Sequence, residues 1–358
     1  MAREAFLPPA AAGASSTAPT SADALATVLL DGVGAVGIRA ARQLVDTPGL
    51  DSLLIAAREF SYADDVAASL GDRAAAIELR PDDPLPAGVD AVATALPAAL
   101  VADRATRALA AGVPFASTVD DADAIDALLE LDDTARRADV LLAPGCGLAP
   151  GLADVLARHA ASALDAVDEI HVARAGSAGP ASTAAVRRAR REPAVEWCDG
   201  EWREERHPTP ELVWFPDPIG ARECLPVTVG VGLLVRAFPG VRRVTVRLAE
   251  PFSRRLAWPG RRGLDEGWGS TRVEVWGWRG QARESMVYGV IDRTAIAAGT
   301  VLAVTAARLA GIAPGLAARN GPSAGAHGLA ALVEPVPFLA ELARRGVKAA
   351  VFEGVAVA

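Results

Sequence analysis

The chain has 358 residues, a formal net charge of −8 at pH 7 and a pI near 5.2, and its length allows two domains with cores of full size. The acidic balance argues against nucleic-acid binding, which needs a basic surface, and three cysteines in so long a chain do not indicate a disulfide framework. The N-terminus lacks the pattern of a signal peptide, and no apolar stretch is long enough to span a bilayer. The sequence therefore predicts a cytoplasmic protein that binds neither nucleic acid nor membranes.

Residues 1–25 are rich in Ala, Ser, Thr and Pro and are predicted to be a disordered tail. From residue 26 to 149, short apolar runs alternate with helical patterns, which is typical of a doubly wound parallel α/β sheet of the Rossmann type. The expected strands are Thr27–Leu30, Leu53–Ala57, Ala75–Leu79, Ala91–Ala95, Pro114–Ser117 and Val140–Ala143.

A glycine-rich turn follows the first expected strand. Gly32, Gly34 and Gly37 have the G-x-G-x-x-G spacing, and Ala35 and Val36 open the helix that follows. In this context the first glycine permits a tight turn, the second lets a pyrophosphate approach the backbone, and the third permits close packing of helix and strand. The alternative is a glycine turn that binds no nucleotide. The context favours a nicotinamide dinucleotide.

The end of the second strand bears on which dinucleotide is bound. Ala57 stands where NAD enzymes usually carry a carboxylate for the ribose hydroxyls, and Arg58 follows it. This arrangement favours NADP, with NAD as the second choice. In the alternative, Arg58 is a solvated surface residue and Glu59 binds the ribose.

Residues 150–312 are predicted to form a second, α+β domain. Leu152–Leu164 is predicted to be a helix. Later apolar residues occupy every second position, as at Val273 and Val275 between Arg272, Glu274 and Trp276. Such alternation indicates a mostly antiparallel sheet with one wet face. Ala297–Leu309 is apolar nearly all round and predicts a buried helix. Residues 313–358 form a C-terminal segment with a helix at Pro337–Arg345 and an apolar run at Ala349–Phe352.

The segment Cys146-Gly-Leu-Ala-Pro-Gly151 resembles a signature of the saccharopine dehydrogenase-like family, which includes lysine 6-dehydrogenase and carboxynorspermidine dehydrogenase. Ala95-Leu96-Pro97, Tyr288-Gly-Val-Ile-Asp292, Ala298-Gly-Thr300 and the run from Phe338 to Gly346 are similar as well. The resemblance implies a Rossmann domain, an inserted substrate domain and a C-terminal segment that returns to the Rossmann domain. It also implies redox chemistry at a carbon that bears an amino group, with Ala95, Leu96 and Pro97 beside the cofactor. The chain departs from the family at Gly145, where aspartate is frequent, and at Ala57.

Three residues are candidates for catalysis. Cys146 follows the sixth strand close to the start of a helix, whose N-terminus can lower a thiol pKa; the alternative is a buried structural cysteine. Asp120 could orient a substrate amine, and of the pair Asp120 and Asp121 one is expected to cap the next helix. Tyr288 lies in an expected strand, where packing is the commoner role of tyrosine.

Other side chains have simpler explanations. The arginines at 187, 188, 190 and 191 could bind a substrate carboxylate, but a solvated helix face is the favoured interpretation. The tryptophans of the second domain could line a pocket, form a subunit interface or pack in a core. His327 stands in a glycine-rich loop that could reach the cleft between the domains, and His159 is expected to be structural. No spacing indicates a metal site.

The leading hypothesis is an oxidoreductase that uses NADP or NAD and acts on the C–N bond of an amino acid, imine or opine-like substrate. The rival hypothesis is a catalytically silent dinucleotide-binding sensor or structural partner. A homodimer is expected only as the commonest arrangement of such proteins.

Overall fold

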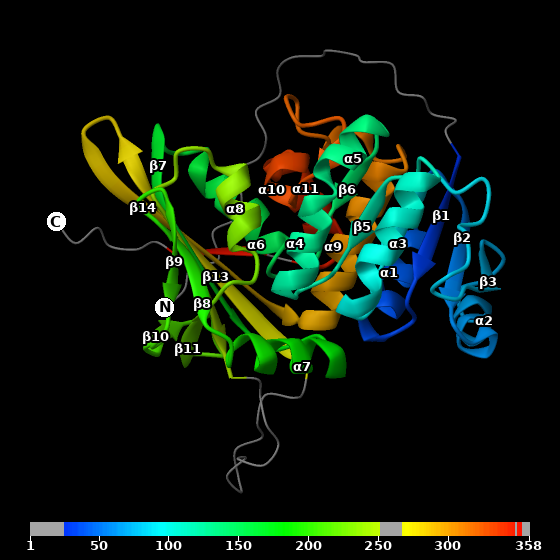
Figure 1. Ribbon diagram of the computed structural model, residues 1–358, viewed down its shortest axis with the longest axis horizontal. Helices are drawn as coiled ribbons and strands as arrows, with labels where there is room; N and C mark the ends of the chain where they lie inside the picture. The colour runs from blue at the N-terminus through cyan, green and yellow to red at the C-terminus, as the bar shows by residue number, and fades with distance from the viewer. Residues whose placement is uncertain (1–24, 251–266, 348, 353–358) are drawn as a thin grey trace, which may run out of the picture.

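The computed structural model describes residues 25–250, 267–347 and 349–352, so residues 1–24 of the predicted tail lie outside the described residues. Two β-sheets stand on either side of a central group of helices (Figure 1). Among the described helices, none is long and apolar enough to cross a membrane.

The first sheet has seven parallel strands in the order β15-β6-β5-β4-β1-β2-β3. Its strands are β1 (Ala26–Asp31), β2 (Leu50–Ala57), β3 (Ala74–Glu78), β4 (Ala91–Thr94), β5 (Phe115–Ser117), β6 (Leu141–Ala143) and β15 (Gly325–Ala326). Val28, Leu29 and Leu30 of β1 are completely buried, as expected for a strand with helices on both faces of the sheet. The predicted Rossmann sheet is confirmed; the two-residue strand β15 was not anticipated.

Helices cover both faces of this sheet. They are α1 (Ala35–Val45), α2 (Phe60–Ala68), α3 (Ala98–Ala110), α4 (Ala122–Glu130), α5 (Asp132–Arg137) and α9 (Thr294–Leu309). Although α9 lies within the range assigned from sequence to the second domain, it packs against α1, β4 and β5 and also contacts β13 and β14. Because α9 is apolar nearly all round, it can be buried between the two sheets.

The second sheet has nine strands, with the main order β10-β11-β12-β7-β13-β14-β16. They are β7 (Ala166–Ala175), β8 (Ala194–Cys198), β9 (Glu201–Glu205), β10 (Glu211–Trp214), β11 (Ala221–Val227), β12 (Arg243–Ala249), β13 (Trp268–Arg279), β14 (Ala282–Arg293) and β16 (Ala349–Phe352). Among the described strand pairs of this second sheet, only β12–β7 is parallel. The prediction of a mostly antiparallel sheet is therefore confirmed.

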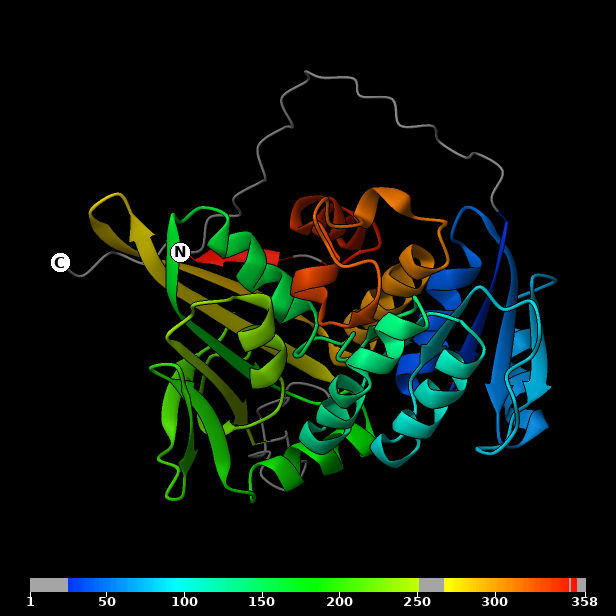
Figure 2. The same cartoon turned by 45° about the horizontal axis from the view of Figure 1, so that its top comes forward.

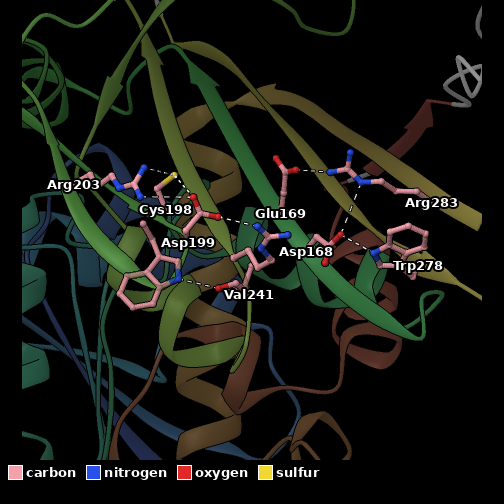
Figure 3. A network of polar contacts seen from close by, with 10 residues as sticks. Asp168, Glu169, Cys198, Asp199, Arg203, Val241, Trp278 and Arg283 are labelled. Atoms are coloured by element: carbon pink, nitrogen blue, oxygen red, sulfur yellow. Dashed lines mark hydrogen bonds and ion pairs between the residues drawn. The ribbon is translucent and has the colours of Figure 1, made fainter.

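The two faces of this sheet differ in chemistry. Helix α6 (Leu152–Ala161) packs on β13, β14 and β7, and the side chains of Val273 and Val275 are completely buried. Polar side chains of different strands contact one another (Figure 3): Trp278 Nε1 on β13 donates to Asp168 Oδ2 on β7 at 2.8 Å, and Arg283 on β14 pairs with Glu169 on β7. The predicted wet face is thus present as a network of polar contacts.

The remaining helices connect these layers. They are α7 (Pro180–Ala189), α8 (Val231–Ala237), the 3-10 turn Pro314–Leu316, α10 (Leu329–Leu332) and α11 (Pro335–Arg344). The C-terminal segment contributes to both sheets, since β15 pairs with β6 and β16 pairs with β14. In Figure 2, α7 (green) runs from the second sheet toward the cyan helices of the Rossmann domain.

Candidate functional site

The glycine turn between β1 and α1 has the geometry of a dinucleotide-binding loop. Gly32 has φ 106°, and a Cβ there would lie 2.8 Å from the Ala95 carbonyl oxygen; at Gly37 a Cβ would lie 1.7 Å from the Gly32 oxygen. Both positions therefore exclude a side chain. Gly34 is different, because a Cβ there would meet nothing within 4 Å. The open side of Gly34 leaves the room that a pyrophosphate needs.

The start of α1 faces the same open space. Ala35 and Val36 form its first turn, where backbone N–H groups lack intrahelical acceptors and the helix dipole favours an anion. Ala95, Leu96 and Pro97, between β4 and α3, line the cavity together with Gly34. The predicted cofactor residues of this loop are thus close together, and they fit a nicotinamide dinucleotide.

Arg58 and Glu59 lie at the carboxyl end of β2. Both side chains are exposed, and Arg58 Nη2 lies 3.6 Å from Glu59 Oε1. Ala57, before them, is buried. A cation and a carboxylate therefore both stand at the strand end where the adenosine ribose of a dinucleotide binds in such sheets.

A cavity of about 430 Å³ extends from this turn to the second domain. Its walls come from the turn, the loops after β4 and β5, the loop Gly147–Pro150, strand β7 and helix α7. A Cβ at Gly179, just before α7, would lie 3.7 Å from the Cβ of Ala35. The second domain thus closes over the dinucleotide turn.

The two neighbouring aspartates after β5 have different roles. Asp121 Oδ1 accepts a hydrogen bond from the Ala124 amide at 3.1 Å and caps α4, which confirms the expectation that one of the pair is a cap. Asp120 lines the cavity, and its Oδ2 accepts hydrogen bonds from Arg174 Nη2 at 3.0 Å and from Ser182 Oγ at 2.8 Å. Asp120 is the candidate for binding a substrate amine.

Arg174 was missed by the sequence analysis. It follows the apolar positions of β7, its side chain is only 4% exposed, and Nη1 donates to the Ala149 carbonyl at 2.7 Å. The one signal in the sequence is an arginine near the end of an apolar strand. Burial of a permanent cation requires acceptors, and here they are Asp120 and the Ala149 oxygen.

The arginine cluster on and after α7 divides into two groups. Arg187 and Arg191 are exposed, as expected of a solvated helix face. Arg188 instead lines the cavity and pairs with Asp121, and Arg190 Nε lies 3.2 Å from Glu250 Oε2. The interpretation of the whole cluster as a solvated face was therefore wrong for Arg188.

Cys146 lies outside the cavity wall. Its side chain is completely buried, and Sγ donates a hydrogen bond to the Ala143 carbonyl oxygen at 3.1 Å. Burial raises the pKa of the Cys146 thiol to about 12. The expectation that a helix N-terminus lowers this pKa was wrong, because the loss of hydration outweighs the dipole. Cys146 is therefore a packed thiol.

The loop after Cys146 explains why its glycines and proline are required. The Ala149–Pro150 peptide bond is cis, and the Gly147 amide donates to the Pro150 oxygen at 3.1 Å. Gly151 has φ 122°, and a Cβ there would lie 2.4 Å from the Gly147 oxygen. At Gly145 a Cβ would lie 2.8 Å from Pro150 Cγ. The aspartate frequent in the family at this position has no space here.

Tyr288 and the two histidines do not line the cavity. Tyr288 on β14 contacts His159 edge-on, with ring centroids 5.4 Å apart, and burial raises the pKa of the tyrosine. His327 Nε2 lies 3.1 Å from the Ala324 oxygen, next to α5. The tryptophans of the described residues are also absent from the cavity wall. Trp197 Nε1, for example, donates to the Val241 carbonyl oxygen at 2.8 Å. Tyr288 and His159 therefore pack against each other, and none of these side chains reaches the cavity.

The sequence matches no protein-family model and no curated protein sequence. Among solved structures, the chain is similar to apo saccharopine dehydrogenase (L-Glu forming) from Saccharomyces cerevisiae, with a TM-score of 0.67 and 14% identity over 92% of this chain and 100% of that chain. It is also similar to the DAP dehydrogenase of C. glutamicum in complex with DAP, with a TM-score of 0.50 and 15% identity over 90% of this chain and 100% of the other. The chain thus has the fold of these two-domain dehydrogenases.

Proposed function

We propose that this protein, which has the fold of saccharopine dehydrogenase, is a member of the saccharopine dehydrogenase-like family and an NAD(P)-dependent oxidoreductase. Its substrate is an amino acid or opine-like compound, and the bond oxidised or reduced is a C–N bond. One observation carries the proposal: the open glycine of the dinucleotide turn and the Asp120 carboxylate line the same cavity. The similar solved structures, a saccharopine dehydrogenase and a DAP dehydrogenase, support it.

The dinucleotide would be held by Gly34, Ala35 and Val36 at its phosphates and by the Ala95–Pro97 loop at its nicotinamide end. When bound, the nicotinamide supplies hydride transfer. We propose NADP as the preferred form, because the exposed Arg58 can pair with a 2′-phosphate. Replacement of Arg58 by alanine should then weaken NADPH binding about tenfold and leave NADH binding unchanged. An unchanged ratio of the two dissociation constants would contradict the assignment.

Asp120 would orient the substrate amine. Its Oδ2 is occupied by Arg174 and Ser182, while no described residue bonds to Oδ1, which leaves Oδ1 for an ammonium group. The two donors hold the carboxylate in one orientation, and that arrangement reduces the entropy lost when a substrate binds. Leu148, Ala149 and Pro150 form an apolar wall beside it that excludes water.

The silent dinucleotide-binding protein remains a second candidate, because Cys146 and Tyr288 do not reach the cavity. Two experiments separate these candidates. The first is fluorescence titration with NADPH and NADH. The second is a screen for a change in nicotinamide absorbance with amino acids, and with 2-oxo acids and ammonia. Binding with turnover supports the oxidoreductase. Binding without turnover over a broad amine panel favours the silent protein, and no binding of either dinucleotide contradicts both.

A further inference from the structure

Among the residues that the structure describes, four charged side chains line the cavity and pair with one another. Asp120 pairs with Arg174, and Asp121 pairs with Arg188. The charges of the described side chains in the cavity wall therefore cancel. Apart from the phosphates of a dinucleotide at the start of α1, a ligand with a net charge would leave that charge without a side-chain partner, whereas a ligand with one positive and one negative group can be matched at both ends.

The two ion pairs differ in how easily they can exchange partners. Both terminal nitrogens of Arg174 are engaged, by the Ala149 oxygen and by Asp120, and the side chain is almost completely buried. The side chain of Arg188 is 52% exposed, on helix α7. Arg174 is thus a positioning residue for Asp120, and Arg188 is the accessible cation of the cavity.

Asp121, the partner of Arg188, has other groups that stabilise its negative charge. Asp121 caps α4, where its Oδ1 accepts the Ala124 amide and the dipole of the helix favours a negative charge. If Arg188 turns to another anion, the Asp121 carboxylate remains compensated. A guanidinium also matches a carboxylate with two parallel hydrogen bonds.

We propose that Arg188 is the specificity-determining residue of the site: it exchanges Asp121 for the carboxylate of the substrate, whose ammonium group binds Asp120. This inference rests on the proposed function. The substrate is then a small zwitterion with one carboxylate and one amine. A plain amine lacks the carboxylate that Arg188 binds. An adduct with further carboxylates finds no second accessible cation among the described wall residues, because Arg174 is buried and already paired. The size agrees, because about 430 Å³ must also receive the nicotinamide end.

A series of compounds related to L-norvaline tests the charge requirement by isothermal titration calorimetry on the full chain with NADPH bound. L-Norvaline is the zwitterion; pentanoate lacks its amine, butylamine lacks its carboxylate, L-glutamate adds a carboxylate and L-ornithine adds an amine. Norvaline should bind at least about tenfold more tightly than each of the other four, because each lacks one charged contact or adds an unmatched charge. Equal binding of norvaline and butylamine, or no binding of any of the five at millimolar concentration, overturns the proposal.

Three variants locate the contact. Arg188→Gln should weaken norvaline binding about tenfold, to the level of butylamine. Arg187→Gln, an exposed change on the same helix, is the matched control and should have no effect. Asp121→Asn keeps a capping side chain but removes the competing carboxylate, so norvaline should bind a few-fold more tightly and glutamate should gain most. Equal effects of the changes at 187 and 188, or weaker glutamate binding to Asp121→Asn, would refute the assignment of Arg188.

Binding of NADPH is measured on the same samples by its fluorescence. If NADPH binds and the zwitterion preference is absent, the inference about Arg188 fails while the dinucleotide-binding function stands. If neither NADPH nor NADH binds, the proposed function itself fails.

Discussion

The three glycines of the dinucleotide turn are required for different physical reasons. Gly32 and Gly37 stand where a Cβ would collide with backbone atoms, at 2.8 Å and 1.7 Å, whereas Gly34 faces open space. Gly34 also has φ −73° and ψ −173°, a conformation that any residue can adopt. Gly32 and Gly37 are therefore required for folding, and only Gly34 is required for binding the ligand.

Substitution should separate these roles. Gly34→Val should leave the melting temperature of the free protein nearly unchanged and weaken NADPH binding by at least about tenfold, since the side chain fills the space left for the pyrophosphate. Gly37→Ala should destabilise the free protein by about 1–3 kcal/mol or more, because α1 must move away from β1. The measurements are thermal unfolding and fluorescence titration of both variants. A Gly34→Val protein that binds NADPH normally would place the pyrophosphate elsewhere.

Residue roles were the least predictable part of the site from the sequence. The glycine spacing located the dinucleotide turn because the pattern is local, and Asp120 and Asp121 follow a strand end where ligands bind in such sheets. The burial of Cys146 and the pairing of Arg188 with Asp121 could not be predicted, for the opposite reason. Both depend on β6, α4 and α7 meeting in space, which spacing along the chain does not encode.

At the scale of elements, the start of α6 shows how a loop is fixed by a buried acid. Asp154 lies in the first turn of α6, almost completely buried, and its Oδ2 accepts a hydrogen bond from the Gly151 amide at 3.1 Å. Burial raises the pKa of Asp154 to about 7, although the hydrogen bond acts in the opposite direction. This carboxyl group supports the turn that carries Gly147–Pro150 into the cavity wall.

The raised pKa of Asp154 has a consequence for stability. The pKa is about 7 in the folded protein and near 4 in an unfolded chain, so the folded state binds the extra proton between these values. Its contribution to stability is present at low pH and is lost as the pH rises through 7. Asp154→Asn cannot ionise and escapes this loss. Between pH 5 and 8 the difference in unfolding free energy should shift in favour of the variant by on the order of 2 kcal/mol.

Urea unfolding of both proteins at the two pH values measures this shift. Asp64→Asn is the control, because Asp64 is exposed on α2 and its replacement should give no pH-dependent difference. A difference between Asp154→Asn and the parent protein that stays constant from pH 5 to 8 would show that Asp154 is already ionised at pH 5.

The sequence predicted most elements but not how they are shared between the two sheets. Alternation of apolar runs with helical patterns identified six strands of the first sheet, and period-2 patterns identified the second. The placement of α9 could not be predicted, because a helix that is apolar all round carries no sign of which surface it meets. Its close fit to α1 depends on Gly299, where a Cβ would lie 2.7 Å from the Cβ of Arg39.

At the scale of the whole molecule, α9 joins the two sheets into one core. Val28 of β1, Val273 of β13 and Leu302 of α9 belong to a single buried cluster, and β15 and β16 tie the C-terminal segment to both sheets. A core that is continuous across two sheets favours one cooperative unfolding transition over two independent ones.

The tryptophans allow the expected single unfolding transition to be tested. All seven follow residue 196, and none lies in the first sheet or in its neighbouring helices α1–α5. Urea unfolding followed by tryptophan fluorescence, which reports on the second domain, should coincide with unfolding followed by circular dichroism, which reports on both. NADPH at one hundred times its dissociation constant should stabilise both signals equally, by about 2.7 kcal/mol. A circular-dichroism transition that splits, with only one part moved by NADPH, would show that the Rossmann domain unfolds on its own. In that case α9 would not couple the two sheets.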